Sequence, residues 1–220
     1  MKTSSIFAAA AVMLAGSAVA APLERRAELV AADIVAQIAP KSVSCAAGSD
    51  ECRTNKQVGE ALVEAMLAYE IYNPAAMASI TALIALESGE FVYKRNLQHD
   101  GADSIHWGQG TSNMQTFKYQ LLFANSFPEV ASQVAALGAV DGNKAAMNKV
   151  LDLVVDDKYN FKSGPWFYAT QCGADVHSAF EGSDLDKAFE LHMACVLGSG
   201  SIAPERTAYW NTAKKAFGLA

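Results

Sequence analysis

A single carboxylate stands at the end of a segment that has no polar face. Residues 75–86 are almost entirely apolar, and a helix that is apolar all round is buried on all sides. Glu87 follows at its carboxyl end, where burial and the negative end of the helix dipole both favour the neutral form of an acid. A carboxyl group that stays protonated near neutral pH is suited to general acid catalysis. The alternative is that Glu87 reaches water or pairs with Lys94 or Arg95.

Residues 89–111 form the longest stretch without helical periodicity. The stretch contains four glycines, and a loop of this length in a compact domain usually has a function. Because the loop begins directly after Glu87, we expect this carboxylate at the floor of whatever the loop encloses. Glu90 could add like charge beside Glu87, or it could be a solvated loop residue.

Short motifs in this region resemble goose-type lysozymes and soluble lytic transglycosylases. The segment Leu86-Glu87-Ser88-Gly89-Glu90-Phe91 resembles their catalytic Glu-Ser motif, at the end of a buried helix. Gly110-Thr-Ser-Asn-Met114-Gln115 resembles their Gly and Met-Gln element, with extra residues in between. Asp100-Gly101 is similar to their acidic loop, and Tyr168-Ala-Thr-Gln171 to their tyrosine motif. The resemblance covers residues 80–116 and, outside them, Tyr168.

The resemblance implies cleavage of a β-1,4 link in a polymer of N-acetylhexosamines. Glu87 would protonate the glycosidic oxygen. Asp100, or alternatively Asp103, would orient and deprotonate a water molecule across a gap of roughly 6.5–9.5 Å. A lytic transglycosylase would need no second carboxylate. Asp100 with Gly101 could instead be an ordinary turn.

The same resemblance implies a set of substrate-binding residues. Tyr93, His106 and Trp107 would stack on sugar rings, and Asn113 and Gln115 would hydrogen-bond an acetamido group. Two further members of the set are Ser88, next to the acid, and Tyr168. As alternatives, the aromatic residues anchor the loop on the core, and the amide side chains cap a helix together with Ser112.

Composition limits the class of protein. Of the 220 residues 51% are hydrophobic and 18% are charged, which is enough apolar material for one sizeable core. The net charge is −6 without a Lys/Arg block, so we expect no nucleic-acid partner. No phosphate-binding loop or metal-ligand cluster is evident, so no cofactor and no metal is predicted. We expect a monomer without membrane contact, with a polysaccharide such as peptidoglycan, chitosan or chitin as its partner.

The amino terminus has the pattern of an export signal. Met1-Lys2, an apolar run and Ser17-Ala-Val-Ala20 predict a signal peptide over residues 1–20. Arg25-Arg26 predicts a propeptide over residues 21–26, so that a catalytic domain over residues 27–220 would remain. We therefore expect a secreted, extracellular protein, and the dibasic pair suggests a fungal secretory route.

The four cysteines form an even set, as expected for disulfides in an exported chain. Counting alone allows three pairings. Local spacing favours Cys45–Cys52 and Cys172–Cys195. A zinc site is the alternative, although no C-x-x-C motif is present.

Helical periodicity dominates the rest of the chain. Asn73 and Pro74 form a strong start signal for the apolar helix, which should run from Ala75 to about Ser88. Other helices are predicted over residues 28–39, 54–72, 112–124, 128–137, 143–155, 184–198 and 204–217. Strands are predicted at residues 91–93 and 166–168. The expected fold class is mostly α, with a single lysozyme-like helical domain around a buried central helix and two disulfides.

The leading hypothesis is a secreted glycosidase, a lysozyme-like muramidase that cleaves peptidoglycan in cell wall degradation. The acidic charge suits a cationic polymer better, so a chitosanase or chitinase-like hydrolase is the runner-up. A lytic transglycosylase, or a non-catalytic secreted interaction protein on the same scaffold, would also fit these residues.

Overall fold

The chain folds into a single, mostly α domain. The computed structural model describes residues 30–97, 106–198 and 200–220. These residues form eleven α-helices and one short 3-10 helix. Their β structure is limited to two isolated bridges, which join Gly110 to Arg95 and to Gln115. The predicted fold class of one mostly α domain is therefore confirmed.

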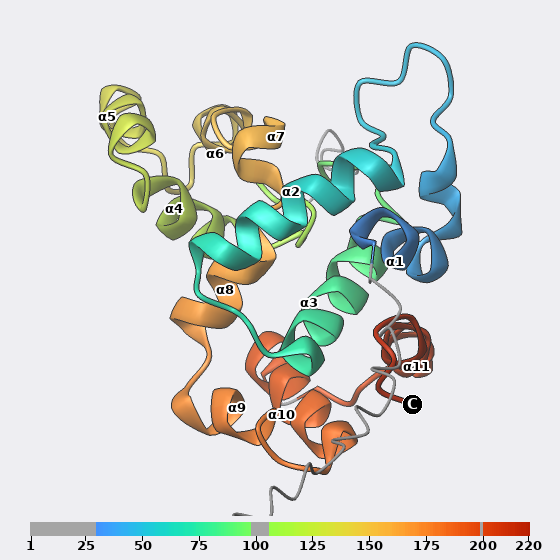
Figure 1. Cartoon of the computed structure of the whole chain (residues 1–220). Helices are drawn as coiled ribbons and strands as arrows, with labels where there is room; N and C mark the ends of the chain where they lie inside the picture. Colours follow the sequence, from blue (N-terminus) through green and yellow to red (C-terminus); the bar gives the residue numbers. More distant parts are fainter. Residues whose placement is uncertain (1–29, 98–105, 199) are drawn as a thin grey trace, which may run out of the picture.

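Figure 1 shows the helices in chain order. They are α1 (Ala31–Ile38), η1 (Pro40–Val43), α2 (Asn55–Ala68), α3 (Pro74–Glu87), α4 (Phe117–Asn125), α5 (Pro128–Ala136), α6 (Lys144–Asp152), α7 (Asp157–Asn160), α8 (Ser163–Gln171), α9 (Ala174–Ala179), α10 (Leu185–Leu197) and α11 (Pro204–Ala216).

Helix α3 is the centre of the fold. Asn73 caps it, because its Oδ1 accepts hydrogen bonds from the backbone N–H groups of Ala75 and Ala76 at 2.8 and 3.1 Å. Ten of its fourteen residues are buried, as predicted from the lack of a polar face. Ser79 is one of them, and its Oγ lies 2.7 Å from Nδ1 of His192 in α10.

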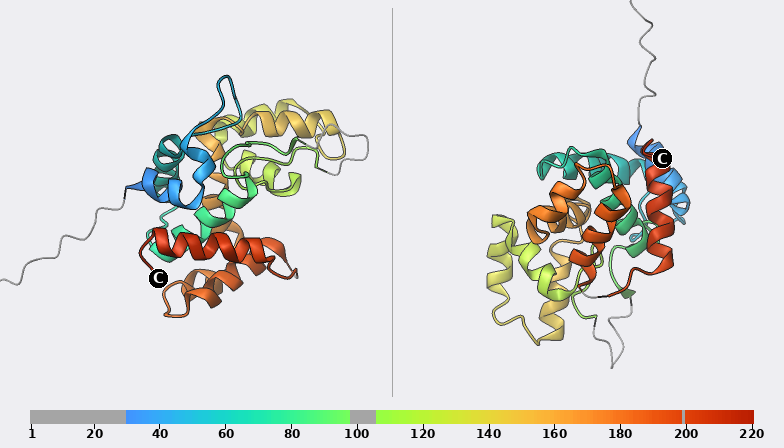
Figure 2. Two further views of the ribbon diagram at one scale, coloured as in Figure 1. Left: turned by 90° about the vertical axis from the view of Figure 1, so that its right-hand side faces the viewer. Right: turned by 90° about the horizontal axis from the view of Figure 1, so that it is seen from below.

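Four helices pack against α3: α1, α8, α10 and α11. Figure 2 shows α11 running across the domain next to α1, so the two ends of the described chain lie together. Helices α1 and α2 also pack on each other at Gly59. A Cβ atom there would lie 2.8 Å from the backbone nitrogen of Ala32, so only glycine allows this approach.

Several local predictions were wrong. Residues 91–93 lie in a turn in which Phe91 has a φ of 65°, and residues 166–168 belong to α8. A short apolar run does not separate a strand from a buried helix, and this ambiguity explains the second error. Residues 112–116 precede α4 instead of opening it, while η1, α7, α8 and α9 were not predicted.

Both favoured disulfides are present, Cys45–Cys52 and Cys172–Cys195, so the cysteines do not form a zinc site. Within the described ranges, no helix has the length and apolarity needed to span a membrane. The predicted signal peptide and propeptide lie outside the described residues, as do Asp100 and Asp103.

Candidate functional site

The end of α3 carries an ion pair instead of an uncompensated acid. Arg206 of α11 donates from Nη2 to Oε1 of Glu87 at 2.5 Å, and both side chains are largely buried. The alternative of an ion pair with Lys94 or Arg95 named the wrong partner, because Glu87 pairs with Arg206. Lys94 lies beside Asp157, and Arg95 pairs with Glu51 and Asp152.

Glu90 is also held by α11. It is buried in spite of its place after the helix, and it accepts hydrogen bonds from the backbone N–H of Lys41 at 2.8 Å and the hydroxyl of Tyr209 at 3.1 Å. Burial, and then the hydrogen bond and charge of Glu90, raise the pKa of Tyr209 to about 12. The solvated loop charge that the sequence suggested is therefore wrong, because α11 covers this turn.

Glu87 lines an open groove of about 470 Å³. Tyr93 and His106 line the same groove, so the structure brings together three of the predicted site residues. Gln109 and Met114 also line the groove. The Nε2 of Gln109 donates to the carbonyl oxygen of Met114 at 2.8 Å, which links these two residues of the lining.

The predicted substrate-binding residue next to the acid has a structural task. Ser88 is buried, and its hydroxyl donates to the carbonyl oxygen of Ile84 at 2.7 Å and accepts from the backbone N–H of Phe91 at 2.8 Å. Ser88 therefore shapes the turn after α3 and does not face the groove.

The other predicted site residues that the structure describes are not among those that line the groove. Asn113 and Gln115 are buried, and Tyr168 is buried against the ring of His192. Trp107 has the ammonium group of Lys144 over its ring, 5.2 Å from the ring centre. Asp100 and Asp103 fall outside the described residues.

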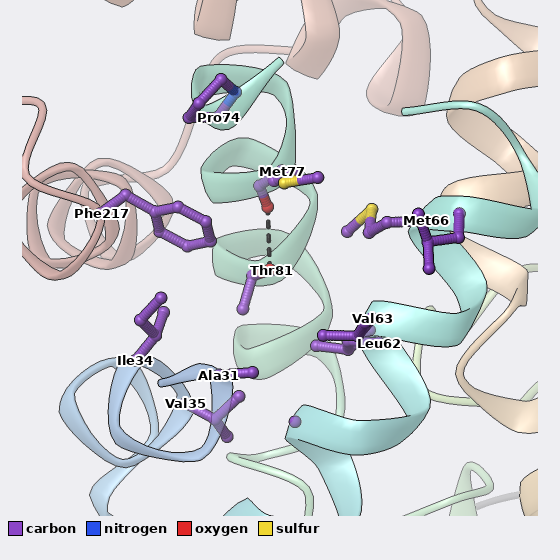
Figure 3. Close-up of a pocket in the computed structure, with 12 residues that line it drawn as sticks. Ala31, Ile34, Val35, Leu62, Val63, Met66, Pro74, Met77, Thr81 and Phe217 are labelled. Carbon is purple, nitrogen blue, oxygen red and sulfur yellow. Dashed lines mark hydrogen bonds between the residues drawn. The ribbon is translucent and has the colours of Figure 1, made fainter. Parts of the chain in front are cut away.

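A second hollow, which we call the apolar pocket, lies between α1, α2, α3 and the end of α11 (Figure 3). Its volume is about 260 Å³. The residues that line it are almost all apolar: Ala31, Ile34, Val35, Gly59, Leu62, Val63, Met66, Leu67, Pro74, Met77, Thr81 and Phe217. The hydroxyl of Thr81 donates to the carbonyl oxygen of Met77 at 2.8 Å, so it is already satisfied.

Two residues of α2 that line the apolar pocket are exposed to solvent. Val63 is 49% exposed and Leu67 is 56% exposed, whereas Leu62 and Met66 on the inner side of the helix are buried. Sequence reasoning did not identify this pocket. Its signal was the exposed apolar pair at positions 63 and 67, which extends the apolar face of α2 beyond what the core requires.

Arg206 and Tyr209 were also missed as partners of the α3 end. They lie three residues apart and therefore share one face of α11. Across the part of the chain that the structure describes, no group of three or more His, Cys, Asp or Glu side chains could hold a metal ion.

Comparison with known proteins identifies a relative among the oxygenases. The bifunctional dioxygenase (DOX)-epoxy alcohol synthase (EAS) of Fusarium oxysporum (strain Fo5176) is 42% identical over 165 residues. These residues are 74% of this chain but only 12% of that protein, so the chain spans a small part of its relative. No family model and no solved structure matches the chain.

This relative contradicts the resemblance to goose-type lysozymes and lytic transglycosylases. The assignment as a glycosidase, and specifically as a peptidoglycan-cleaving muramidase, is therefore wrong. The relative does not favour a chitosanase, a chitinase-like hydrolase, a transglycosylase or an interaction protein either. The resemblance depended on short motifs around Glu87, whereas the match to the oxygenase extends over most of the chain.

Proposed function

We propose that this chain binds an apolar small molecule in the apolar pocket and acts as a ligand-binding module for oxygenase chemistry. The observation that carries the proposal is a hollow of about 260 Å³ with an almost purely apolar lining. Protein interiors are close-packed, and voids larger than a water molecule are few. An apolar cavity of ~150 Å³ already accommodates benzene, so this pocket has room for a larger hydrocarbon group.

The side chains of the pocket suit a flexible ligand. Met66 and Met77 face the hollow from α2 and α3 (Figure 3), and unbranched thioether side chains adapt their shape to what they contact. Val63 and Leu67 provide an apolar entrance from solvent. The satisfied hydroxyl of Thr81 leaves little polar recognition inside, which favours the hydrocarbon part of a molecule.

The name of the relative supports the same class of ligand. A dioxygenase adds molecular oxygen to a carbon compound, and an epoxy alcohol carries its two oxygens on a carbon skeleton. We propose that the ligand of this chain is a substrate or product of that kind, bound through its hydrocarbon portion. The polar end of such a molecule would remain near the entrance formed by Val63 and Leu67.

A series of primary alcohols from hexanol to decanol tests the proposal by calorimetric titration. Each buried CH₂ contributes about 0.8 kcal/mol, so affinity should rise about fourfold per carbon until the pocket is full and then level off. An epoxy alcohol of matching chain length should compete with the best alcohol. Affinity that does not change with chain length would contradict a hydrocarbon site.

Two variants locate the binding. Val63→Asn places an amide at the entrance of the pocket and should weaken binding of the best alcohol at least about fivefold. Val43→Asn is the matched control, because Val43 is 60% exposed in η1 and lies outside the pocket lining. Equal affinities of the two variants would place the ligand elsewhere and refute the proposal.

We also propose that the protein is exported, as the sequence of residues 1–26 predicts. The two disulfides support this, because such bonds persist mainly in oxidising compartments. Amino-terminal sequencing of protein from culture medium should find Ala21 or Ala27 as the first residue. Recovery of the full-length chain from the cell interior alone would contradict export.

A further inference from the structure

A third hollow, of about 400 Å³, lies between the α2–α3 connection and helices α8 and α9. We call it the tyrosine–glutamate pocket. Four aromatic rings and two carboxylates line it: Tyr69, Tyr72, Tyr168, His177, Glu70 and Glu181. None of the described residues that line it is a lysine or an arginine. The hollow therefore combines aromatic rings with two carboxylates.

Two of the tyrosines that line the pocket, Tyr69 and Tyr168, have raised pKa values and are neutral phenols near neutral pH. Burial raises the pKa of Tyr69 to about 12. Burial, followed by the charge of Glu181, raises the pKa of Tyr168 to about 12.

Hydrogen bonds fix the walls of the pocket before any ligand enters. Asn73 donates from Nδ2 to the carbonyl oxygen of Phe180 at 2.9 Å and to Oε1 of Glu181 at 3.3 Å, which links the α2–α3 connection to the end of α9. His177 donates from Nε2 to the carbonyl oxygen of Tyr168 at 2.8 Å, and the two rings lie 4.7 Å apart between centroids.

Glu70 occupies a backbone position that glycine would fill more easily. Its φ is 55°, in the left-handed region. Its N–H bonds to Leu67 O, and the N–H of Ile71 bonds to Met66 O, which is the Schellman arrangement that usually has glycine at this place. A residue held in an unfavourable conformation points to a role for its side chain, and this side chain lines the pocket.

From these observations we propose that the tyrosine–glutamate pocket binds an organic cation, specifically a quaternary or alkylated ammonium group. Aromatic faces attract such cations through the ring quadrupole, and quaternary ammonium groups are recognised by clusters of aromatic rings. The carboxylates of Glu70 and Glu181 add Coulombic attraction. The site is separate from the apolar pocket, so the inference does not depend on the function proposed above.

Calorimetric titration of the full chain with choline tests the inference. The control ligand is the neutral isostere of choline in which carbon replaces the quaternary nitrogen. Choline should bind saturably and at least about fivefold more tightly than the isostere, because only the cation gains from rings and carboxylates. Equal binding of the two molecules, or no binding of choline, would overturn the inference.

Variants distinguish binding from stability. Glu70→Gln should weaken choline binding about fivefold, whereas Glu64→Gln removes the same charge from an exposed position of α2 outside the pocket and should leave binding unchanged. Glu70→Gly should weaken binding while raising Tm by about 2–4 °C, because glycine relieves the left-handed strain. Unchanged choline affinity in both Glu70 variants would overturn the inference.

Discussion

Replacing His192 by glutamine should make the protein less sensitive to mild acid. His192 is 1% exposed, and its ring lies against Ser79 and Tyr168. Burial, and secondarily the charge of His177, lower the pKa of His192 from 6.5 to about 3. In the unfolded chain the imidazole of residue 192 therefore takes up a proton near the ordinary histidine pKa of 6.5. In the folded chain the imidazole of His192 stays neutral until about pH 3.

The size of the effect follows from this difference. Because the folded pKa is lowered, the unfolded state binds more protons as the pH falls below 6.5, and folding stability is lost progressively until the folded pKa is reached. One pH unit corresponds to about 1.36 kcal/mol, so the wild type should lose about 2 kcal/mol between about pH 7.5 and pH 5. That is a large share of a total stability of ~5–15 kcal/mol.

Urea unfolding at constant ionic strength over this pH range measures the loss. Carboxylates contribute little to the change, because this pH range lies above their ordinary pKa values of ~3.9–4.3. The His192→Gln variant should be less stable at neutral pH but nearly insensitive to acid, while the control His177→Gln should keep the slope of the wild type. The reasoning is refuted if His192→Gln loses as much stability as the wild type.

Three further outcomes can be measured by urea unfolding near neutral pH. Arg206→Ala leaves the largely buried carboxylate of Glu87 without its ion pair and should lower the free energy of unfolding by about 1–3 kcal/mol. Arg206→Lys should lose less stability than Arg206→Ala, and equal losses would contradict the role of the ion pair. Gly59→Ala should lower the free energy of unfolding by about 1–3 kcal/mol, because the new Cβ would lie 2.8 Å from the backbone of α1. Alanine has the better helix propensity, so a more stable variant would contradict this packing. Removal of the Cys172–Cys195 disulfide, whose cysteines are 23 residues apart, should lower the free energy of unfolding by about 3 kcal/mol. Removal of Cys45–Cys52, with a separation of 7 residues, should lower it by about 2 kcal/mol. The reverse order would contradict the loop-entropy argument.

The central helix and the disulfides could be predicted because their signals are local. Asn73 and Pro74 mark the start of α3, and the apolar residues that follow leave no face for water. The favoured cysteine pairs are close in sequence, so chain geometry alone brings them together. One mostly α domain follows from these signals and from the composition.

The surroundings of Glu87 could not be predicted in the same way. Its partner Arg206 lies 119 residues further along the chain, and no local pattern specifies which helix will cover the end of α3. The tyrosine at position 168 stands in an apolar run with Trp166 and Phe167, whose pattern fits a strand as well as a buried helix. Packing against α3 favours the helix over the strand for residues 166–168, and Gly164 allows α8 to approach Ile84 closely.

The short motifs around Glu87 led to the wrong chemistry for a physical reason. A carboxylate at the end of a buried helix requires a compensating group, and a structural ion pair satisfies this requirement as well as a catalytic site does. The sequence shows Glu87 without its partner, so the two arrangements could not be separated. The extended match to an oxygenase and the Arg206 ion pair together replace that interpretation.

The position of α11 also determines when the domain can become complete during synthesis. Helix α11 packs against both α1 and α3, and its Arg206 and Tyr209 hold Glu87 and Glu90 at the carboxyl end of α3. A nascent chain emerges from its amino terminus, so the apolar surface of α3 stays partly uncovered until residues 204–216 have left the ribosome. A chaperone that binds apolar segments would meet this surface in every newly made molecule, and a stop codon shortly before residue 204 would leave it uncovered permanently.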